Sequence, residues 1–535
     1  MTTPVPRSVT PTAVPTAEEA LNQLIAKRAG ISDKGRPEAA QRQHQLGKYT
    51  ARERIAMLVD PGSFQEIGGL VEPDRSTFDT EGLQAPADGV LTGYARIGGR
   101  PICLTSYDFT VVGGSNGNIG ERKVERLALT ALEHGYPMVM LLEGGGHRIQ
   151  EGLDSRHFAA GGSGFFQVAI ELSGWVPVVA AVMGPGFAGP ANAAAMADFV
   201  VMVRPTATLG VAGPFLVEAS SGEKIDKWAL GGADTQVDHN GLAHRGADTE
   251  EEALAALRSY LSYLPTNSGE RPPVSAALAP EASYEKALAQ LVPDSPRQPY
   301  DMLDAIRGMV DRDSVFEVQP TFAVNLVTCF ARFEGRPVGI IANQPRHLAG
   351  TLDARACEKG AHCISVCDAF GLPLVYLVDV PGFLVGSEAE STLLARRSAR
   401  LLFELGQATV PRLSIVLRKG YGLGYLAMCG GRAFDADLCV AWPTAEICAM
   451  SVEGAVDVAY RRQVSEASDP AARRAALIAR FRTQLGALQA AEHFGIDDVI
   501  DPRETRSAIV ATLERCAPRK LHRRRAVKVH AISPI

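Results

Sequence analysis

The sequence predicts an α/β protein made of two copies of one domain. Short apolar strands alternate with helices along the chain, and such alternation is typical of parallel sheets that are buried on both faces. Segments of the first half also recur in the second half, in the same order and at a nearly constant offset. Finally, 535 residues are too many for one ordinary hydrophobic core, so we expect at least two domains.

Four pairs of similar segments define the duplication. The offset between partners is 236 residues in the first two pairs (330 − 94 and 371 − 135), then 239 and 238, so only short loops differ between the copies. The pairs are 94–101 with 330–337, 135–143 with 371–379, 197–199 with 436–438, and 204–207 with 442–445. From them we predict a flexible leader 1–16, a first domain 17–275, a linker 276–298 and a second domain 299–535.

The first copy is expected to open with helices. A polar helical pattern covers 17–46, and Thr50 with Glu53 forms a capping box at the start of a second helix. Further elements follow from periodicity, because amphipathic runs predict helices and continuous apolar runs predict buried strands. These are a helix at 121–134, a strand at 137–142, a helix at 165–172, a strand at 176–183 and a helix at 246–265.

The end of the second copy is rich in alanine and arginine. One long helix is predicted at 470–494, and a basic segment follows at 519–525. We interpret this segment as a solvated tail or as an arm that contacts a neighbouring subunit. Nucleic-acid sites usually combine basic residues with aromatic ones, which this segment lacks.

Composition and charge exclude several classes of protein. A net charge of −6 gives no general attraction to nucleic acid or anionic lipid, and no apolar run is long enough for a membrane span. The Thr/Pro-rich N-terminus lacks the charged and apolar regions of a signal peptide, which favours a cytoplasmic protein. The nine cysteines lack Cys-x2-Cys pairs, so we expect reduced thiols, no disulfide framework and no structural metal.

Two stretches share the same layout of strand, glycine turn and helix start. The first covers 176–198, and Pro190 within it suits the first helical position because it needs no backbone N–H there. The second covers 414–428. Backbone amides at such points can stabilise a negatively charged oxygen without any acid or base side chain, and two such sites suggest two carbonyl compounds in one reaction. The candidate catalytic residues are Ala188, Gly189, Leu423 and Gly424.

A glycine-rich loop follows the strand at 137–142. Gly145 and Gly146 would let a ligand approach the backbone closely, and Arg148 is a candidate contact for phosphate. A segment of similar position in the second copy, 379–383, supports a functional interpretation of this loop. His147 is expected to be a hydrogen-bonded loop residue rather than a general base.

Residues 113–117 match the G-x-S-x-G pattern, which in hydrolases places a nucleophilic serine on a sharp turn. The segment before them is not a clean apolar strand, and neither His239 nor His244 stands out as the base. A hydrolase is therefore an alternative hypothesis.

From about residue 47 to its end, the chain resembles the carboxyltransferase (β) subunit of biotin-dependent acyl-CoA carboxylases, of the propionyl-CoA and methylcrotonyl-CoA type. The resemblance rests on seven segments spread over both halves. They are 47–54 (GKYTARER), 108–115 (DFTVVGGS), 148–152 (RIQEG), 342–345 (ANQP), 378–383 (VDVPGF), 441–446 (AWPTAE) and 497–502 (DDVIDP).

This resemblance implies two tandem crotonase-like domains of ββα spiral units, in a homohexamer whose active sites lie between the first domain of one chain and the second domain of another. A biotin carboxylase or biotin carboxyl carrier subunit would present carboxybiotin, and an acyl-CoA would accept the carboxyl group at its α or vinylogous γ carbon. No metal is expected in this subunit. The alternatives are a biotin-dependent acyl-CoA decarboxylase subunit, and a hydrolytic or non-catalytic member on the same scaffold.

The family's two oxyanion holes match two pairs of residues by position, Ala188 with Gly189 and Leu423 with Gly424. We assign the thioester to the first hole and the biotin ureido oxygen to the second, and the roles could be exchanged. The resemblance adds substrate-binding positions, namely Gly145, Gly146, Arg148, Tyr425 and Leu426. Leu426 stands where propionyl-type enzymes carry Asp, which implies a different or longer acyl group.

Overall fold

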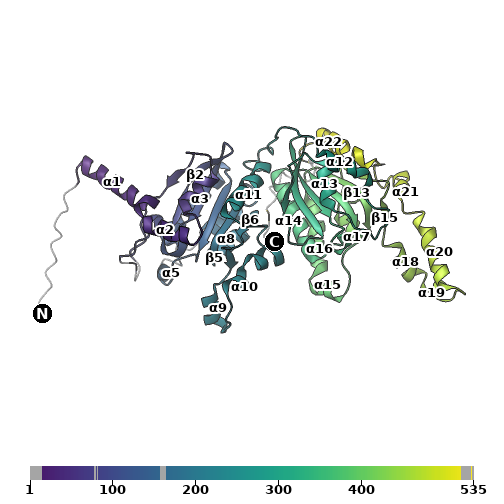
Figure 1. Ribbon diagram of the computed structural model, residues 1–535, viewed down its shortest axis with the longest axis horizontal. Helices are drawn as coiled ribbons and strands as arrows, with labels where there is room; N and C mark the ends of the chain where they lie inside the picture. Colours follow the sequence, from purple (N-terminus) through teal and green to yellow (C-terminus); the bar gives the residue numbers. More distant parts are fainter. Residues whose placement is uncertain are drawn as a thin grey trace.

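The computed structural model consists of two α/β halves, each built on its own eight-stranded sheet (Figure 1). It describes residues 15–76, 80, 82–156, 159, 164–519 and 532. Most of the predicted leader and residues 520–525 of the basic segment lie outside the described residues.

The sheet of the first half has the strand order β1-β2-β3-β4-β5-β6-β8, and β7 pairs with β5. The pairings β1–β2 and β2–β3 are antiparallel, and the others are parallel. The strands are β1 (Gln65–Ile67), β2 (Val90–Ile97), β3 (Arg100–Tyr107), β4 (Met138–Gly144), β5 (Val178–Phe187), β6 (Phe199–Val203), β7 (Thr208–Gly210) and β8 (Arg245–Ala247).

The sheet of the second half repeats this topology, with the order β9-β10-β11-β12-β13-β14-β16 and β15 paired with β13. Antiparallel and parallel pairings fall at the same places as in the first half. This match confirms the predicted duplication of an α/β unit. The strands are β9 (Phe316–Val318), β10 (Leu326–Phe333), β11 (Arg336–Asn343), β12 (Leu374–Val380), β13 (Arg412–Tyr421), β14 (Leu438–Ala441), β15 (Glu446–Cys448) and β16 (Asp498–Val499).

Helices connect and flank the strands of both sheets (Figure 1). In the first half they are α1 (Ala17–Ile31), α2 (Pro37–Gln45), α3 (Ala51–Leu58), α4 (Asn118–His134), α5 (Ile149–Gly152), α7 (Gly164–Leu172), α8 (Gly189–Ala195), α9 (Pro214–Ser221), α10 (Lys227–Gly231) and α11 (Glu250–Tyr263). In the second half they are α12 (Ala282–Ala287), α13 (Met302–Met309), α14 (Ala354–Phe370), α15 (Ser387–Ser391), α16 (Leu394–Gln407), α17 (Gly422–Ala427), α18 (Val452–Ala459), α19 (Arg461–Ser465), α20 (Pro470–Arg482), α21 (Ala487–Glu492) and α22 (Thr505–Arg515).

Two of the predicted helices are each interrupted. The pattern at 17–46 forms α1 and α2, with a short 3-10 turn, Asp33–Gly35, between them. The predicted helix at 470–494 forms α20 and α21, because Leu485 between them accepts a hydrogen bond from Ile447 N at 2.9 Å. The capping box of Thr50 and Glu53 is confirmed, and it opens α3.

The central helix α14 joins the two halves. It is buried along nearly its whole length, and Figure 1 shows it beside the first half. His362 of α14 places its Nε2 atom 3.0 Å from His244 Nε2 and 3.0 Å from the Asp198 carbonyl oxygen, both in the first half. The halves therefore share buried polar contacts as well as apolar packing.

A buried lysine occupies the same position in both copies, since 123 and 359 differ by the 236-residue offset. Lys123 Nζ of α4 donates to the carbonyl oxygens of Ala87 (2.8 Å) and Val90 (2.6 Å). Lys359 Nζ of α14 donates to the carbonyl oxygens of Gln319 and Phe322, both at 2.8 Å. Ala87 and Gln319 both have positive φ, so each lysine holds a backbone turn of uncommon geometry. Burial lowers the pKa of each amine to about 8.

Replacing Lys123 with Met should remove part of the pH dependence of stability. Above pH 8 the folded chain releases the Lys123 proton, while the unfolded chain keeps it up to about pH 10, so stability rises with pH. Between about pH 8 and pH 10, the free energy of unfolding of the natural chain should therefore rise by about 1.4 kcal/mol per pH unit relative to that of the Lys123→Met variant. Urea unfolding across this range measures the difference, with Lys27→Met at an exposed lysine as the control. Parallel curves for the natural chain and Lys123→Met would contradict the account.

Candidate active site

The first candidate site forms where β5 runs into α8. Residues 184–187, which follow the predicted strand 176–183, extend β5 instead of forming the predicted turn, because residues 185–187 pair in parallel with β7. Ala188 then turns the chain with φ 60° and ψ −120°, a region that favours glycine, and Gly189 begins α8. Pro190 is thus the second helical residue, not the first, and the N–H that it lacks is still one that a helix leaves unpaired.

The two amides predicted for this site differ in their partners. Ala188 N donates to the Gly210 carbonyl oxygen at 3.0 Å, as the last hydrogen bond between β5 and β7. Gly189 N makes no hydrogen bond with any described residue. Of this pair, Gly189 is therefore the amide available to a ligand.

Gly189 lines a small cavity with a mainly apolar wall. Gly146 of the predicted loop lies across from it, because a Cβ atom added to Gly146 would be 3.3 Å from Gly189 N. Gly146 also has φ 83°, so two independent constraints favour glycine there. The neighbouring Gly145 is exposed and has open space around it. The other lining residues are Thr105, Tyr107, Asn116, Glu121, Val124, Met140, His147, Phe165, Phe166, Pro190 and Ala193.

The second candidate site forms where β13 runs into α17. Gly422 begins the helix with φ 59°, and the amides of Leu423 and Gly424 donate to no described residue. Gly424 cannot carry a side chain, because a Cβ atom there would lie 2.9 Å from Gly382 Cα. The Leu423 side chain is 50% exposed, so it forms part of the open surface around these amides. Leu426 is half-buried against the core.

Tyr425 points into the protein instead of toward this surface. It is buried, and its ring fills the space beside Gly430, where an added Cβ atom would lie 2.1 Å from the ring. The structure thus places Tyr425 as a packing group beneath α17. This differs from the substrate contact that the resemblance implies for it.

Arg148 is also buried, with a side chain only 1% exposed. Its guanidinium pairs with Asp88 at 2.8 Å and with Glu151, and these carboxylates are themselves fully buried. Asp88 accepts from Gly120 N and Glu151 accepts from Asn118 N, both at 2.7 Å, so the two carboxylates bind the N-terminus of α4. The predicted role of Arg148 as a phosphate contact is not supported by this placement.

The Arg148 network instead holds the glycine loop in place. Arg148 N donates to the Asn116 carbonyl oxygen at 2.7 Å, and Asn116 N donates to the Gly146 carbonyl oxygen at 3.1 Å. His147, between them, places Nδ1 2.9 Å from Glu121 Oε1, and this contact raises the pKa of the imidazole. His147 is therefore the hydrogen-bonded loop residue that the sequence analysis expected.

Comparison with known proteins identifies the family of this chain. The family "Carboxyl transferase domain" matches residues 42–530. The chain is 41% identical over 500 residues to the propionyl-CoA carboxylase carboxyltransferase subunit of Haloferax mediterranei, covering 93% of this chain and 96% of that protein. The chain belongs to the carboxyl transferase family.

Other members of the carboxyl transferase family extend the match. The methylmalonyl-CoA decarboxylase subunit alpha of Veillonella parvula is 38% identical over 520 residues, covering 97% of this chain and all of that protein. The crystal structure of transcarboxylase 12S, described as a hexamer with methylmalonyl-coenzyme A bound, superposes with a TM-score of 0.89 at 38% identity and covers 97% of this chain and 98% of that one. These findings confirm the resemblance, the two tandem crotonase-like domains and a biotin-dependent enzyme that transfers carboxyl groups to or from an acyl-CoA.

Within this carboxyl transferase fold, sequence reasoning missed a pair of buried carboxylates. Glu143 and Asp379, which differ by the 236-residue offset, end β4 and β12 and are fully buried. Glu143 pairs with Lys48 and Arg54, whereas Asp379 pairs with Arg418 at 3.0 Å. A charged residue at the same place in two apolar strands was the signal that could have revealed them. These pairs anchor the ends of β4 and β12, which lie beside the strands β5 and β13 from which the candidate sites begin.

The hydrolase alternative finds no support in the geometry. Ser115 donates its hydroxyl to the Val112 carbonyl oxygen at 2.8 Å, His244 contacts His362, and His239 contacts Asn240. The Ser115 hydroxyl thus has a backbone partner, and neither His239 nor His244 contacts it in these hydrogen bonds. Within the described residues, no group of three or more His, Cys, Asp or Glu side chains could hold a metal ion, and no helix is long and apolar enough to cross a membrane.

Replacing Arg148 with Met should destabilise the first half strongly. The change leaves Asp88 and Glu151 buried without their cation, and breaking a buried pair in this way costs about 3–5 kcal/mol. Arg156→Met is the matched control, because that arginine is exposed and its pair with Asp154 should contribute less than about 1 kcal/mol. Urea denaturation of both variants measures the free energies of unfolding. Equal effects of the two changes would contradict the role of Arg148.

Proposed function

We propose that this chain is the carboxyltransferase subunit of a biotin-dependent acyl-CoA carboxylase and that it works with a separate subunit carrying biotin. The observation that carries the proposal is the Gly189 amide, which has no partner among the described residues and lines a cavity whose wall is mainly apolar. Its counterpart in the second half, at Leu423 and Gly424, supplies further amides of the same kind.

The proposed chemistry needs backbone donors more than titrating side chains. An acyl-CoA becomes reactive when its α carbon loses a proton, which the ureido nitrogen of biotin would accept once it has given up its carboxyl group. Negative charge then develops on the thioester oxygen. The Gly189 N–H would donate to that oxygen, and the Leu423 and Gly424 N–H groups would donate to the ureido oxygen of biotin. Biotin, when bound, supplies the carboxyl group. Donors held in place before the reaction stabilise such charge without reorganisation, typically by about 100- to 1,000-fold per donor.

The surroundings of Gly189 fit the acyl part of a thioester. Phe165, Phe166 and Ala193 contribute to the cavity wall and offer apolar contact, while Gly146 lets the ligand come close to the backbone. In the second half, Leu423 and Leu426 add apolar surface near the other amides. We therefore propose an acyl group with a longer apolar chain than propionyl, since each well-placed methylene is worth about 1–3 kcal/mol of discrimination.

The two sets of amides lie in different halves of one chain, α8 in the first and α17 in the second (Figure 1). A reaction between two bound carbonyl compounds requires both sets in one site. We propose that the first domain of one chain and the second domain of a neighbouring chain form this site in a homohexamer. The hexameric transcarboxylase 12S, which superposes over nearly the whole chain, supports such an assembly.

A second candidate function is decarboxylation of an acyl-CoA. It rests on the 38% identity to the Veillonella parvula decarboxylase subunit, over all of that protein. The amides would serve carboxylation and decarboxylation equally, because the same charged oxygens develop in both directions of the reaction. The two functions are distinguished by whether the purified complex fixes bicarbonate with ATP or releases CO2 from a malonyl-type thioester.

The experiment that tests the proposal is a substrate panel. The chain is purified with the biotinylated protein that accompanies it, as detected with streptavidin, and incorporation of labelled bicarbonate is measured with acetyl-, propionyl-, methylcrotonyl- and longer acyl-CoA. We expect incorporation, with a higher kcat/KM for acyl groups longer than propionyl. Absence of incorporation into every thioester would contradict the carboxylase, and a preference for propionyl-CoA would contradict the assignment of Leu426.

Replacing Gly189 with Pro should lower kcat by about 100-fold or more, because it removes one oxyanion donor. Gly189→Ala is the matched control, because it keeps the N–H and its Cβ atom meets no other atom within 4 Å. This control should retain most of the activity. Initial rates of carboxylation measure both variants, and circular dichroism checks that each is folded. Similar losses in the two variants would contradict the role of the amide.

A further inference from the structure

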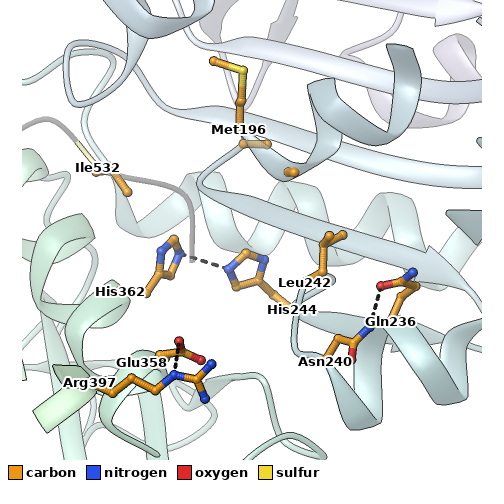
Figure 2. Close-up of a pocket in the computed structure, with 11 residues that line it drawn as sticks. Met196, Gln236, Asn240, Leu242, His244, Glu358, His362, Arg397 and Ile532 are labelled. Atoms are coloured by element: carbon orange, nitrogen blue, oxygen red, sulfur yellow. Dashed lines mark hydrogen bonds and ion pairs between the residues drawn. The ribbon is translucent and has the colours of Figure 1, made fainter. Parts of the chain in front are cut away.

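A second cavity lies at the junction of the two halves, at the opposite end of α8 from the first candidate site (Figure 2). Its volume is about 310 Å³, enough for a small metabolite. The first half contributes the end of α8 and the segment from Gln236 to His244, and the second half contributes α14, α16 and Ile532. The polar lining residues are Gln236, Asn240, His244, Glu358, His362 and Arg397.

The histidine pair in this wall has a defined arrangement of protons. Val200 N donates to His244 Nδ1 at 3.0 Å, so the proton of the neutral His244 ring is on Nε2. That proton points to His362 Nε2, 3.0 Å away, which therefore accepts. Burial lowers the pKa of His362 to about 4, so this ring is neutral as well and carries its proton on Nδ1. His362 Nε2 also lies 3.0 Å from the Asp198 carbonyl oxygen. This second contact is less favourable, because His362 Nε2 and the carbonyl oxygen are then both acceptors.

His362 Nδ1 is consequently a buried donor that lacks an acceptor. The residue is 4% exposed, and none of the described residues hydrogen-bonds to this atom. Buried polar atoms are rarely left in this state in native proteins unless water or a ligand supplies the partner. Since His362 forms part of the cavity wall, a molecule in the cavity could supply the missing acceptor.

Arg397 provides positive charge to the same cavity. Its Nε atom pairs with Glu358 Oε1 at 2.9 Å, and within the described chain no other group pairs with the guanidinium. The two Nη atoms of Arg397 therefore have unused N–H groups, and the side chain is 34% exposed. The amides of Gln236 and Asn240 are bonded to each other, at 3.2 Å. The unsatisfied groups of the wall are thus mostly donors.

We propose that this junction cavity binds a small anion through carboxylate or phosphate oxygens, held by Arg397 and by the Nδ1–H of His362. An anionic oxygen satisfies both donors, and planar Arg is well suited to pair with carboxylate or phosphate. Because the wall comes from both halves, the anion would stabilise their junction. This inference does not depend on the proposed carboxylase activity.

Binding is tested on the full-length chain in the oligomer as purified. Inorganic phosphate and malonate are titrated separately by calorimetry and by thermal melting, with sodium chloride at matched ionic strength as the blank. We expect saturable binding of at least one anion and a rise in Tm. Arg397→Gln should weaken binding by about 10-fold or more, whereas Arg396→Gln, at the exposed neighbour on α16, should leave it unchanged.

Tungstate soaked into crystals of the natural chain locates the anion directly, even if Arg397→Gln fails to fold. Anomalous density between Arg397 and His362 would support the proposal. Absence of binding by both anions, or binding that Arg397→Gln leaves unchanged, would overturn it. Carboxylation by Arg397→Gln is measured in parallel, so a failure of the proposed function is distinguished from a failure of this site.

Discussion

A backbone amide can stabilise a charged oxygen only if no carbonyl group of the protein already takes its hydrogen, and this constraint shapes the first site. The pairing of β5 with β7 continues up to Ala188, whose N–H goes to Gly210, and stops there. The positive φ of Ala188 then turns the next amide, that of Gly189, away from the sheet. A non-glycine residue in this conformation costs on the order of 1–3 kcal/mol, which the surrounding sheet must offset. The opposite wall is equally constrained, since Arg148 and Asn116 fix the position of Gly146.

The second copy also positions free backbone amides at a helix start, but different side chains support the neighbouring strand. Asp379 replaces Glu143 at the strand end, and its cation comes from β13 instead of from the segment that precedes the first sheet. Arg148 corresponds by the 236-residue offset to Leu384, so the second copy lacks the ion pairs of the guanidinium. The backbone bonds of the loop recur there, with Leu352 N donating to the Gly382 carbonyl oxygen and Leu384 N to the Leu352 carbonyl oxygen. The lysines that hold the turns, Lys123 and Lys359, are retained in both. Backbone geometry is therefore what the copies share, and this agrees with a chemistry based on amides.

The sequence predicted the architecture well because periodicity and duplication act over many residues. The strands expected at 137–142 and 176–183, the helix expected at 121–134 and the positions of both helix starts follow from these long-range patterns, and they appear as β4, β5, α4, α8 and α17. Individual contacts could not be read in this way. The hydrogen bond of Ala188 N forms with a carbonyl oxygen of β7, a strand that comes later in the sequence. The Tyr425 ring turns into the protein because Gly430 leaves space for it. Arg148 looked like a phosphate contact because the sequence does not show that Asp88, 60 residues away, lies beside it.

The central claim is that amides from two chains form one active site, and complementation between two inactive variants tests it most directly. Gly189→Pro disables the first-domain amide, and Leu423→Pro disables one in the second domain. Co-expressed with different tags and purified as mixed oligomers, the two variants should regain carboxylation, because one site of each mixed pair combines an intact first domain with an intact second domain. Mixed oligomers that form but stay as inactive as either variant alone would contradict the account.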